Sequence, residues 1–549
     1  MPAGVCAVVR RGAADLRGGL TTMSARRMTR ESPGASRALV WSFVNTAISR
    51  LGTLGIGIVL ARLLGPEAFG TYAVAFVALA AVLSFNELGV SLAIVRWPGD
   101  PREIAPTVTT ISVAASLLFF AVAWVTAAPF AEAMGDPTAT PVVRLLLVSV
   151  LINGAVATPA ALLQRDFRQG TRMIVDQVNV WSGAIVSIVL ALAGFGAMSL
   201  AVGRIVGTVL SAGLFVLYSP LPYRFGLNRE NLRSLLSFGL PLAGVSIIVF
   251  AVGYADQLVV GNLLGPTMLG FYVLAFNLAS WPVSMFSQPL RSVAPAAFAR
   301  LQHSHEAMRT AYLAFLRVVA AVAVPVCFMI AGAAEPVIRF VYGERWAPAA
   351  QALSWLALLA AFRIVFELAY DYLVVAKRSG SLLLVQVTWL VALLPALVVG
   401  ALLGGISAVG AAQVVVAAVV VTPIYLWRLK RSGVRPRAVA AQIWLPLVVG
   451  LAVFVASRAL SLIASSCFLA AALSGVVALA AIGLLLYRDR STVVSLRRIG
   501  EDDPVRPGAA RPAPEARLLP RLRRQAKPAE PRREQSRPAQ ATPRANGRG

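Results

Sequence analysis

Charged residues are scarce in this sequence. Only 13% of its 549 residues are charged, whereas an ordinary soluble domain carries about a quarter. Because 58% of the residues are hydrophobic and the mean hydropathy is +0.75, a typical soluble globular protein is excluded.

Cysteine and histidine are also rare, and their positions argue against metal chemistry. Cys6, Cys327 and Cys467 lie far apart and follow neither a disulfide framework nor a metal-ligand spacing. His303 and His305 stand two positions apart, so they would face different sides of a helix. No metal site is expected.

Motifs for catalysis and nucleotide binding are missing too. The sequence contains no G-x-x-x-x-G-K-[ST] loop, so the chain carries no P-loop ATPase of its own. Its net charge of +26 lies in basic ends and in short connections between apolar runs. The basic C-terminal tail has no interleaved aromatic residues, so nucleic acid is not an expected partner. We therefore expect neither an enzyme nor a cofactor.

What the sequence does have is a series of long apolar runs. A helix needs about 20 mostly apolar residues to cross the hydrocarbon core of a bilayer. Fourteen runs qualify, or twelve if the last pair is misread, which predicts an all-α polytopic membrane protein with about 14 transmembrane helices. The runs occupy residues 38–60, 72–95, 105–130, 142–163, 174–194, 198–218, 236–262, 269–290, 311–333, 350–375, 380–403, 407–427, 439–458 and 466–487.

The charges in the connections between these runs test the count independently. Positive residues collect on the cytoplasmic side of membrane proteins. With the N-terminus inside, 18 Lys and Arg fall in the inner connections and four in the outer ones. This bias predicts that both termini lie in the cytoplasm. The four outer residues are Arg62, Arg339, Arg345 and Arg458.

One apolar segment occurs twice along the chain. It reads LARLLGPEAFGTYAVAF at 60–76 and VGNLLGPTMLGFYVLAF at 260–276, with eight of 17 positions identical. The Gly-Pro pair predicts a turn between two helices, because Pro cannot continue a helix and Gly tolerates turn geometry. Six spans separate the copies, so both run the same way through the membrane. The pattern predicts two parallel six-helix repeats, an arrangement typical of alternating-access transporters.

The repeats set the predicted domain organisation. The C-terminal tail is rich in Pro, Arg and Ala and is expected to be disordered. It fits a solvated basic tail, a contact with anionic lipid head groups or a docking segment for a cytoplasmic partner. The predicted units are a basic N-terminal tail (1–37), an N-lobe (38–220), a C-lobe (221–430), a pair of accessory helices (431–487) and the C-terminal tail (488–549).

Several ionisable residues lie inside the predicted spans. A charge at a helix centre costs roughly 2.5–3.5 kcal/mol on insertion scales, so each should face a water-filled cavity or a partner. Asp176, Arg144 and Arg317 lie at span edges and are expected to be interfacial. The residues within the spans are Arg50, Glu87, Arg204, Asp256, Arg363, Glu367 and Asp371.

Three of these residues form one polar stripe. Arg363, Glu367 and Asp371 recur every four positions and so share one helix face. The stripe fits either a self-neutralised Arg363–Glu367 pair that fixes helix packing or one wall of a central cavity. Arg50 has no acidic residue one turn away, which makes it the stronger candidate for a ligand contact.

The two charge types suggest two roles. A guanidinium binds phosphate through two parallel hydrogen bonds and stays charged, so Arg50, Arg204 and Arg363 are candidate substrate-binding residues. The carboxylates are candidates for ion coupling, with H⁺ or Na⁺, or for cavity lining. These are Glu87, Asp256, Glu367 and Asp371.

Five motifs in one order resemble a known family. The first motif joins LARLLGPEAFGTYAVAFVAL to FNELGVSLAIVR, and the other four are LLQRDFR, YADQLVVGNLLGPTMLGFYVLAFNL, VAPAAFARLQ and FVYGERWAPAAQAL. Together they resemble the polysaccharide transporter (Wzx-type flippase) family of the multidrug/oligosaccharidyl-lipid/polysaccharide exporter superfamily. The resemblance covers about 38–430.

The resemblance implies a function in the bacterial inner membrane. Members move a lipid-linked oligosaccharide, usually on undecaprenyl pyrophosphate, to the outer leaflet for surface polysaccharide biosynthesis. Polymerase and assembly proteins are candidate partners. The family motifs carry over to Glu87, to Asp256 and to the external loop 342–346, whose role is expected to be structural.

Other functions stay open at this stage. A small-molecule or drug:cation antiporter of the same superfamily, or a lipid II flippase, would share the predicted fold. A membrane scaffold that recruits partners through its tail is the alternative from another class. The mixture of arginines and carboxylates in the spans does not separate the transport alternatives.

Overall fold

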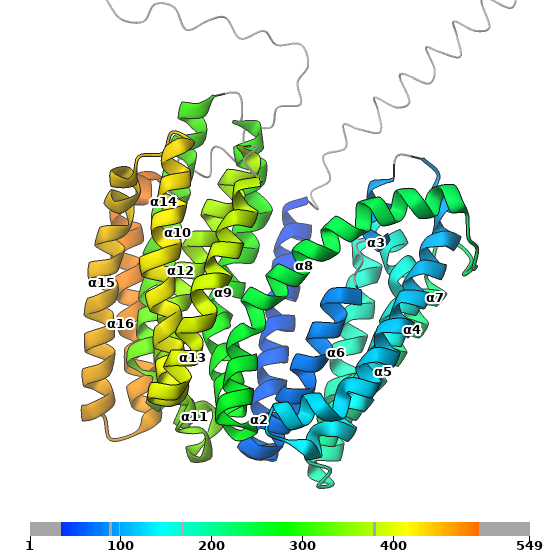
Figure 1. Cartoon of the computed structure of the whole chain (residues 1–549). Coiled ribbons are helices and arrows are strands. Elements are labelled where there is room, and N and C mark those ends of the chain that lie inside the picture. The colour runs from blue at the N-terminus through cyan, green and yellow to red at the C-terminus, as the bar shows by residue number, and fades with distance from the viewer. Residues whose placement is uncertain are drawn as a thin grey trace, which may run out of the picture. The chain divides into compact units, whose positions relative to one another are not determined.

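The computed structural model describes residues 35–86, 90–97, 99–166, 168–301, 304–376 and 380–492 (Figure 1). These residues form helices and contain no strand, which confirms the predicted all-α class. The α-helices are α2 (Ala35–Asn86), α3 (Val90–Arg96), α4 (Pro101–Ala133), α5 (Thr140–Arg165), α6 (Gln169–Leu192), α7 (Ala197–Leu217), α8 (Arg229–Leu264), α9 (Pro266–Arg300), α10 (His305–Gly332), α11 (Ala334–Tyr342), α12 (Ala349–Val375), α13 (Gly380–Val416), α14 (Thr422–Arg431), α15 (Pro436–Ile463) and α16 (Cys467–Arg488). Two short 3-10 helices, η1 (Pro137–Ala139) and η2 (Glu344–Trp346), and a π-helical segment, η3 (Ala417–Val421), lie between them.

Twelve helical stretches among the described residues are long and apolar enough to cross a membrane. Two of them contain a break, one at Gly65 in α2 and one at Gly404–Gly405 in α13. The chain reverses at the second break, because Trp389 before it and Tyr425 after it both contact the ring of Phe366. The predicted total of 14 spans and the division into repeats stay predictions.

Local sequence signals fix several helix ends. The carboxylate of Asp100 accepts a hydrogen bond from the backbone N–H of Arg102 at the start of α4, at 2.9 Å. Ser304 and Ser466 cap the starts of α10 and α16 in the same way. Such caps satisfy N–H groups that have no partner inside the helix, and each contributes about 1 kcal/mol.

The repeated Gly-Pro turns fold alike. Gly65 has a φ of 75° and Gly265 a φ of 85°, a left-handed conformation that favours glycine. In both copies the next residue is the proline that opens the second helix arm. The predicted turn geometry is therefore confirmed at both positions.

Further contacts gather around these turns, at the end of the bundle that we call the turn end. Arg62 of α2 donates through Nε to the carbonyl oxygen of Val341 in α11, at 2.8 Å. The indole N–H of buried Trp346 donates to the carbonyl oxygen of Ala61, at 3.1 Å. On the other side, Thr71 donates to the carboxylate of Asp136 at 2.7 Å. The first and third quarters of the chain are thus tied together at this end.

The last two helices pack on the preceding bundle rather than standing apart (Figure 1). Helix α15 contacts α10 along its length, and α16 contacts α15, α10 and α11. Close approach is possible because Gly332 of α10 has no side chain: a Cβ there would lie 2.5 Å from the carbonyl oxygen of Phe454. An ion pair between Arg317 of α10 and the buried Asp489 fixes the end of α16.

The outer faces of the helices are apolar and open. Val125, Leu403 and Ile463 keep 76%, 82% and 81% of their surface exposed. Large aliphatic side chains this exposed would be unfavourable in water, and in a bilayer they face lipid. Their distribution agrees with a multi-pass membrane protein.

Candidate functional site

Two polar cavities lie inside the helical bundle, one in each half of the chain. The C cavity is lined by α8, α9, α12, α13 and α14 and has a volume of about 360 Å³. The N cavity is lined by residues from each of the helices α2 to α7 and has a volume of about 470 Å³. Polar walls inside membrane-spanning helices mark places where water or a ligand is held.

Asp256 is the most buried charged group of the C cavity. Only 2% of its surface is exposed. Its Oδ2 accepts hydrogen bonds from the hydroxyl of Tyr272 at 2.7 Å and from Nε2 of Gln413 at 3.2 Å. Its Oδ1 accepts from the backbone N–H of Gln257 at 2.8 Å. Helix α8 thus supplies the carboxylate, and α9 and α13 each supply a side-chain donor to it.

Arg363 lines the same cavity and acts electrostatically on Asp256. Its guanidinium carbon lies 5.4 Å from the ring centroid of Phe276, a cation–π distance. Glu367 also lines the cavity, and its buried Oε2 has no hydrogen-bond partner among the described residues. No ion pair joins Arg363 and Glu367 in the described part of the chain. The guanidinium is therefore not neutralised by the neighbour one turn away.

Arg204 stands in the N cavity in a matching arrangement. Its guanidinium carbon lies 5.3 Å from the ring centroid of Phe76. The guanidinium group also interacts with the hydroxyl of Tyr72. Its buried Nε has no hydrogen-bond partner among the described residues. Phe76 and Phe276 are equivalent positions of the repeated segment, so the same repeat residue holds one arginine in each cavity.

The rest of the N cavity is built from amides, hydroxyls and two further charges. Arg172 donates through Nη1 to Oε1 of Gln164 at 2.9 Å. Asn179 donates to the hydroxyl of Ser211 at 3.0 Å. Asp176, which we expected at the interface, contributes to the lining as well.

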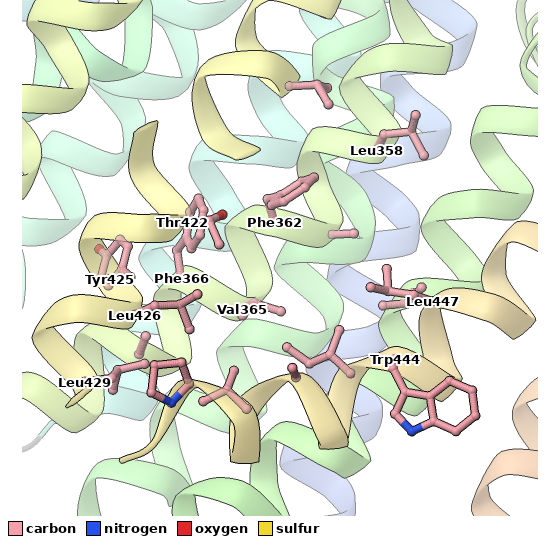
Figure 2. A pocket seen from close by; sticks show the side chains of 18 of the residues that line it. Leu358, Phe362, Val365, Phe366, Thr422, Tyr425, Leu426, Leu429, Trp444 and Leu447 are labelled. Carbon is pink, nitrogen blue, oxygen red and sulfur yellow. The ribbon is translucent and has the colours of Figure 1, made fainter. Parts of the chain in front are cut away.

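A third cavity is almost entirely apolar. It has a volume of about 450 Å³ and lies between α10, α12, α14 and α15. Figure 2 shows its wall, with Tyr425 and Phe366 on one side and Trp444 of α15 on the other. Phe366 and Tyr425 also line the C cavity, and their rings stack with centroids 5.0 Å apart. We call this space the apolar cavity; it shares a wall with the C cavity.

The structure brings together some of the predicted site residues and not others. Asp256, Arg363 and Glu367 share the C cavity, whereas Arg204 lies in the N cavity. Asp371 is buried in α12 and lines neither. The side chain of Arg50 and the whole of Glu87 lie outside the described part of the structure.

Sequence reasoning missed the neutral amides. Asn153 and Asn179 line the N cavity, and Gln386 and Gln413 line the C cavity. An uncharged amide inside an apolar run is itself costly in a bilayer, so its presence was the available signal. Among the described residues, no group of three His, Cys, Asp or Glu side chains could hold a metal ion.

Comparison with known sequences gives a family and several relatives. The family model described as "Polysaccharide biosynthesis protein" matches residues 59–351, more than half of the 549-residue chain. The chain is 27% identical to the succinoglycan biosynthesis transport protein ExoT of Rhizobium meliloti (strain 1021), over 59% of this chain and 65% of ExoT. It is 23% identical to the lipopolysaccharide biosynthesis protein WzxC of Escherichia coli (strain K12), over 77% of this chain and 87% of WzxC. The match thus spans just under two thirds of ExoT and most of WzxC.

Comparison with solved structures gives the fold. The lipid II flippase MurJ in an inward closed conformation superimposes with a TM-score of 0.69 at 11% identity, covering 83% of this chain and 100% of MurJ. An inward-facing multidrug resistance MATE family transporter of the MOP superfamily gives a TM-score of 0.56 at 18% identity, covering 70% of this chain and 98% of the transporter. The chain shares their polytopic helical fold.

Proposed function

Because the chain belongs to the polysaccharide biosynthesis protein family, we propose that it is a flippase for lipid-linked oligosaccharides. The substrate carries its sugars on a polyprenyl pyrophosphate and moves from the inner to the outer leaflet for surface polysaccharide biosynthesis. The relatives named for succinoglycan transport and lipopolysaccharide biosynthesis support this substrate class. The protein acts by alternating access, without a catalytic step of its own.

The observation that carries this proposal is the shared wall between a charged cavity and an apolar one. Phe366 and Tyr425 line both spaces, with Arg363 on the polar side and Trp444 on the apolar side. A molecule with an anionic head and a long hydrocarbon chain can place its head in the C cavity and its chain in the apolar cavity at the same time. A small hydrophilic solute would leave the apolar cavity unused.

The arginines supply the charge that the head group needs. Leaving water is costly for a diphosphate, and a fixed guanidinium offsets that cost through charge-assisted hydrogen bonds. Arg363 in the C cavity and Arg204 in the N cavity both lie on aromatic rings without a carboxylate bound to them. We assign all three arginines to substrate binding: Arg363 and Arg50 to the diphosphate, and Arg204 to the sugar that follows it.

The carboxylates are assigned to coupling and cavity lining. Asp256 is held by three donors in a buried position, so a change in its protonation or an added cation would disturb α8, α9 and α13 together. It is the foremost candidate for a site of H⁺ or Na⁺ coupling. Glu367, Glu87 and Asp371 remain further candidates.

Topology and partners complete the proposal. The excess of positive residues in alternate connections supports an inner-membrane location with both termini in the cytoplasm. The repeated segment supports two six-helix lobes that rock against each other, with α15 and α16 as an accessory pair. Polysaccharide polymerase and assembly proteins are the candidate protein partners.

The test is a deletion strain of the source organism, complemented with the wild-type gene or with Arg363→Ala. Surface polysaccharide and polyprenyl-linked oligosaccharide are quantified from the same cells. We expect deletion to abolish the surface polymer and to raise the lipid-linked pool, with rescue by the wild type and weak rescue by the variant. If neither pool changes on deletion, in a strain without a second flippase of this family, the proposed function is wrong.

A drug:cation antiporter is tested in the same strain. An antiporter would leave both glycan pools unchanged and alter resistance to cationic drugs. A lipid II flippase would instead raise the peptidoglycan precursor pool on depletion. The three transport functions therefore give different combinations of glycan pools, peptidoglycan precursor pool and drug resistance.

A further inference from the structure

The N cavity differs from the C cavity in chemistry, and this difference points to a second binding site. We propose that the N cavity binds the sugar residues of the lipid-linked substrate, through Asn153, Asn179, Asp176 and Arg172. This inference rests on the proposed function, because it assigns the glycan part of that substrate. The diphosphate is assigned to the C cavity and the hydrocarbon chain to the apolar cavity.

Two of these four side chains also join helices, since Arg172 bonds to Gln164 and Asn179 to Ser211, but acceptor atoms of the other two have no partner among the described residues. Asn153 donates one N–H to the carbonyl oxygen of Ser149 on its own helix, at 2.8 Å, which leaves its side-chain oxygen available. Asp176 makes no hydrogen bond or ion pair with any described residue, although the charge of Arg172 acts on it. By contrast, Thr109 and Thr158, which tie α4 to α5, bond directly to each other at 2.9 Å. The side-chain oxygen of Asn153 and the carboxylate of Asp176, which lie in a membrane bundle without such a partner among the described residues, are expected to meet a ligand or water.

The donor and acceptor set fits a polyol better than a simple ion. A bare cation would be repelled by Arg172 and Arg204, and a simple anion would pair with these arginines but leave the carboxylate of Asp176 without a donor. A sugar hydroxyl both donates and accepts, so it can pair with a carboxylate, an amide and a guanidinium in turn. The cavity wall offers all three groups, and its net charge of one positive unit also suits an acidic sugar.

The C cavity lacks this character. Its lining includes five aromatic residues (Phe276, Phe366, Tyr370, Trp389 and Tyr425), and its amide Gln413 is already bound to Asp256 and Tyr272. Its other polar side chains, Arg363, Glu367 and Gln386, share the wall with these rings, whereas Phe215 is the one aromatic residue among the described residues that line the N cavity. The two halves of the chain are therefore suited to different parts of one amphiphilic substrate.

The test measures sugar binding without lipid or diphosphate. Full-length protein in lipid nanodiscs is mixed with the oligosaccharide repeat unit released by partial acid hydrolysis from the surface polysaccharide of the source strain. Binding is read by saturation-transfer NMR on the sugar protons. We expect a signal from the wild type that falls at least about fivefold in Asn179→Leu and in Asp176→Asn, because each loses hydrogen bonds to the ligand.

The control variants separate this site from other effects. Asp176→Asn keeps the side-chain shape and should fold, and melting temperatures verify folding for both variants. Thr388→Val should keep the sugar signal, since the hydroxyl of Thr388 bonds only within its own helix and the residue lines none of the three cavities. An undiminished signal in folded Asn179→Leu and Asp176→Asn would overturn the inference, as would displacement of the sugar by pyrophosphate.

Failure of the inference is distinguishable from failure of the proposed function. If the wild type gives no sugar signal while gene deletion still raises the lipid-linked pool, the flippase stands and the N-cavity site is wrong. If the sugar binds in the N cavity while deletion changes neither glycan pool, the site stands and the flippase is wrong.

Discussion

Gly70 and Gly270 occupy equivalent positions of the repeated segment, and each presses on the other copy. A Cβ on Gly70 would lie 2.1 Å from the carbonyl oxygen of Pro266, and a Cβ on Gly270 would lie 2.7 Å from that of Pro66. The contact is reciprocal, as expected for two related turns meeting about a local axis. Backbone contact of this kind leaves no room for a side chain at either glycine.

Replacing Gly70 with alanine should therefore open or strain this contact. The atoms in the way are backbone, which cannot move aside as a flexible side chain would, so we expect a loss of about 1–3 kcal/mol in stability. Flipping should fall as well, because the closed arrangement of the turn end becomes less populated. Thermal melting of purified Gly70→Ala and polysaccharide levels in complemented cells measure the two effects.

A second glycine of the same helix provides the control. Gly57 is exposed and a Cβ there meets nothing within 4 Å, so Gly57→Ala should melt at or above the wild-type temperature. Gly270→Ala should behave like Gly70→Ala if the contact is reciprocal in effect as well as in geometry. If Gly70→Ala melts and flips substrate like the wild type, the contact between the two turns contributes neither to stability nor to flipping.

Asp256 gives a prediction on coupling. We expect Asp256→Asn to lower gradient-driven transport at least about tenfold, because the neutral amide can neither take up a proton nor attract a cation. Tyr272→Phe removes one donor to that carboxylate and should cost about 1.5–3 kcal/mol in stability while transport is retained in part. Proteoliposomes with an imposed proton or sodium gradient and a fluorescent lipid-linked oligosaccharide provide the assay.

Asp136 is the matched carboxylate for this comparison. It is buried and accepts hydrogen bonds from Thr71 and Thr138 at the turn end, away from all three cavities. Asp136→Asn should lower stability without removing the dependence on the gradient. Equal gradient dependence in wild type and Asp256→Asn would remove Asp256 from the coupling mechanism.

The aromatic supports of the two arginines can be tested as a pair. Phe76→Leu and Phe276→Leu keep an apolar side chain but remove the ring face beneath Arg204 and Arg363. A cation–π contact contributes roughly 0.5–2 kcal/mol, so we expect a several-fold rise in KM for the lipid-linked substrate with a smaller change in maximal rate. Phe195→Leu, at an exposed position, is the control. An unchanged KM in both variants would mean that the rings do not position the guanidiniums.

The sequence predicted the turns better than the cavities, and the reason is physical. Gly-Pro constrains the backbone locally, so Gly65 and Gly265 could be placed in turns without tertiary information. Arg204 and Arg363 could be identified because a charge in an apolar run is costly wherever it lies. Their separation into different cavities could not be foreseen, since it depends on how α7 and α12 rotate in the bundle.

The apolar cavity lay beyond sequence reasoning for a different reason. Leucines, valines and aromatic residues that line a cavity look the same in sequence as those that fill a core or face lipid. Only the packing of α15 against α10 and α14 leaves the space open next to Phe366 and Tyr425. The order of apolar residues along the sequence therefore does not indicate where a cavity lies.

Filling that space tests whether it receives the hydrocarbon chain. Ala440 of α15 lines the apolar cavity, and its neighbour Ala441 on the same helix does not. We expect Ala440→Phe to slow flipping of a long-chain polyprenyl substrate several-fold, because the new ring occupies volume that the chain needs. A short-chain farnesyl analogue should be flipped at nearly the wild-type rate, since it requires less of the cavity.

Ala441→Phe is the control, because it adds the same ring without entering the cavity and should leave both rates unchanged. Equal slowing of the two substrates by Ala440→Phe would instead assign the effect to altered packing of α15, and the chain would then remain in the surrounding lipid.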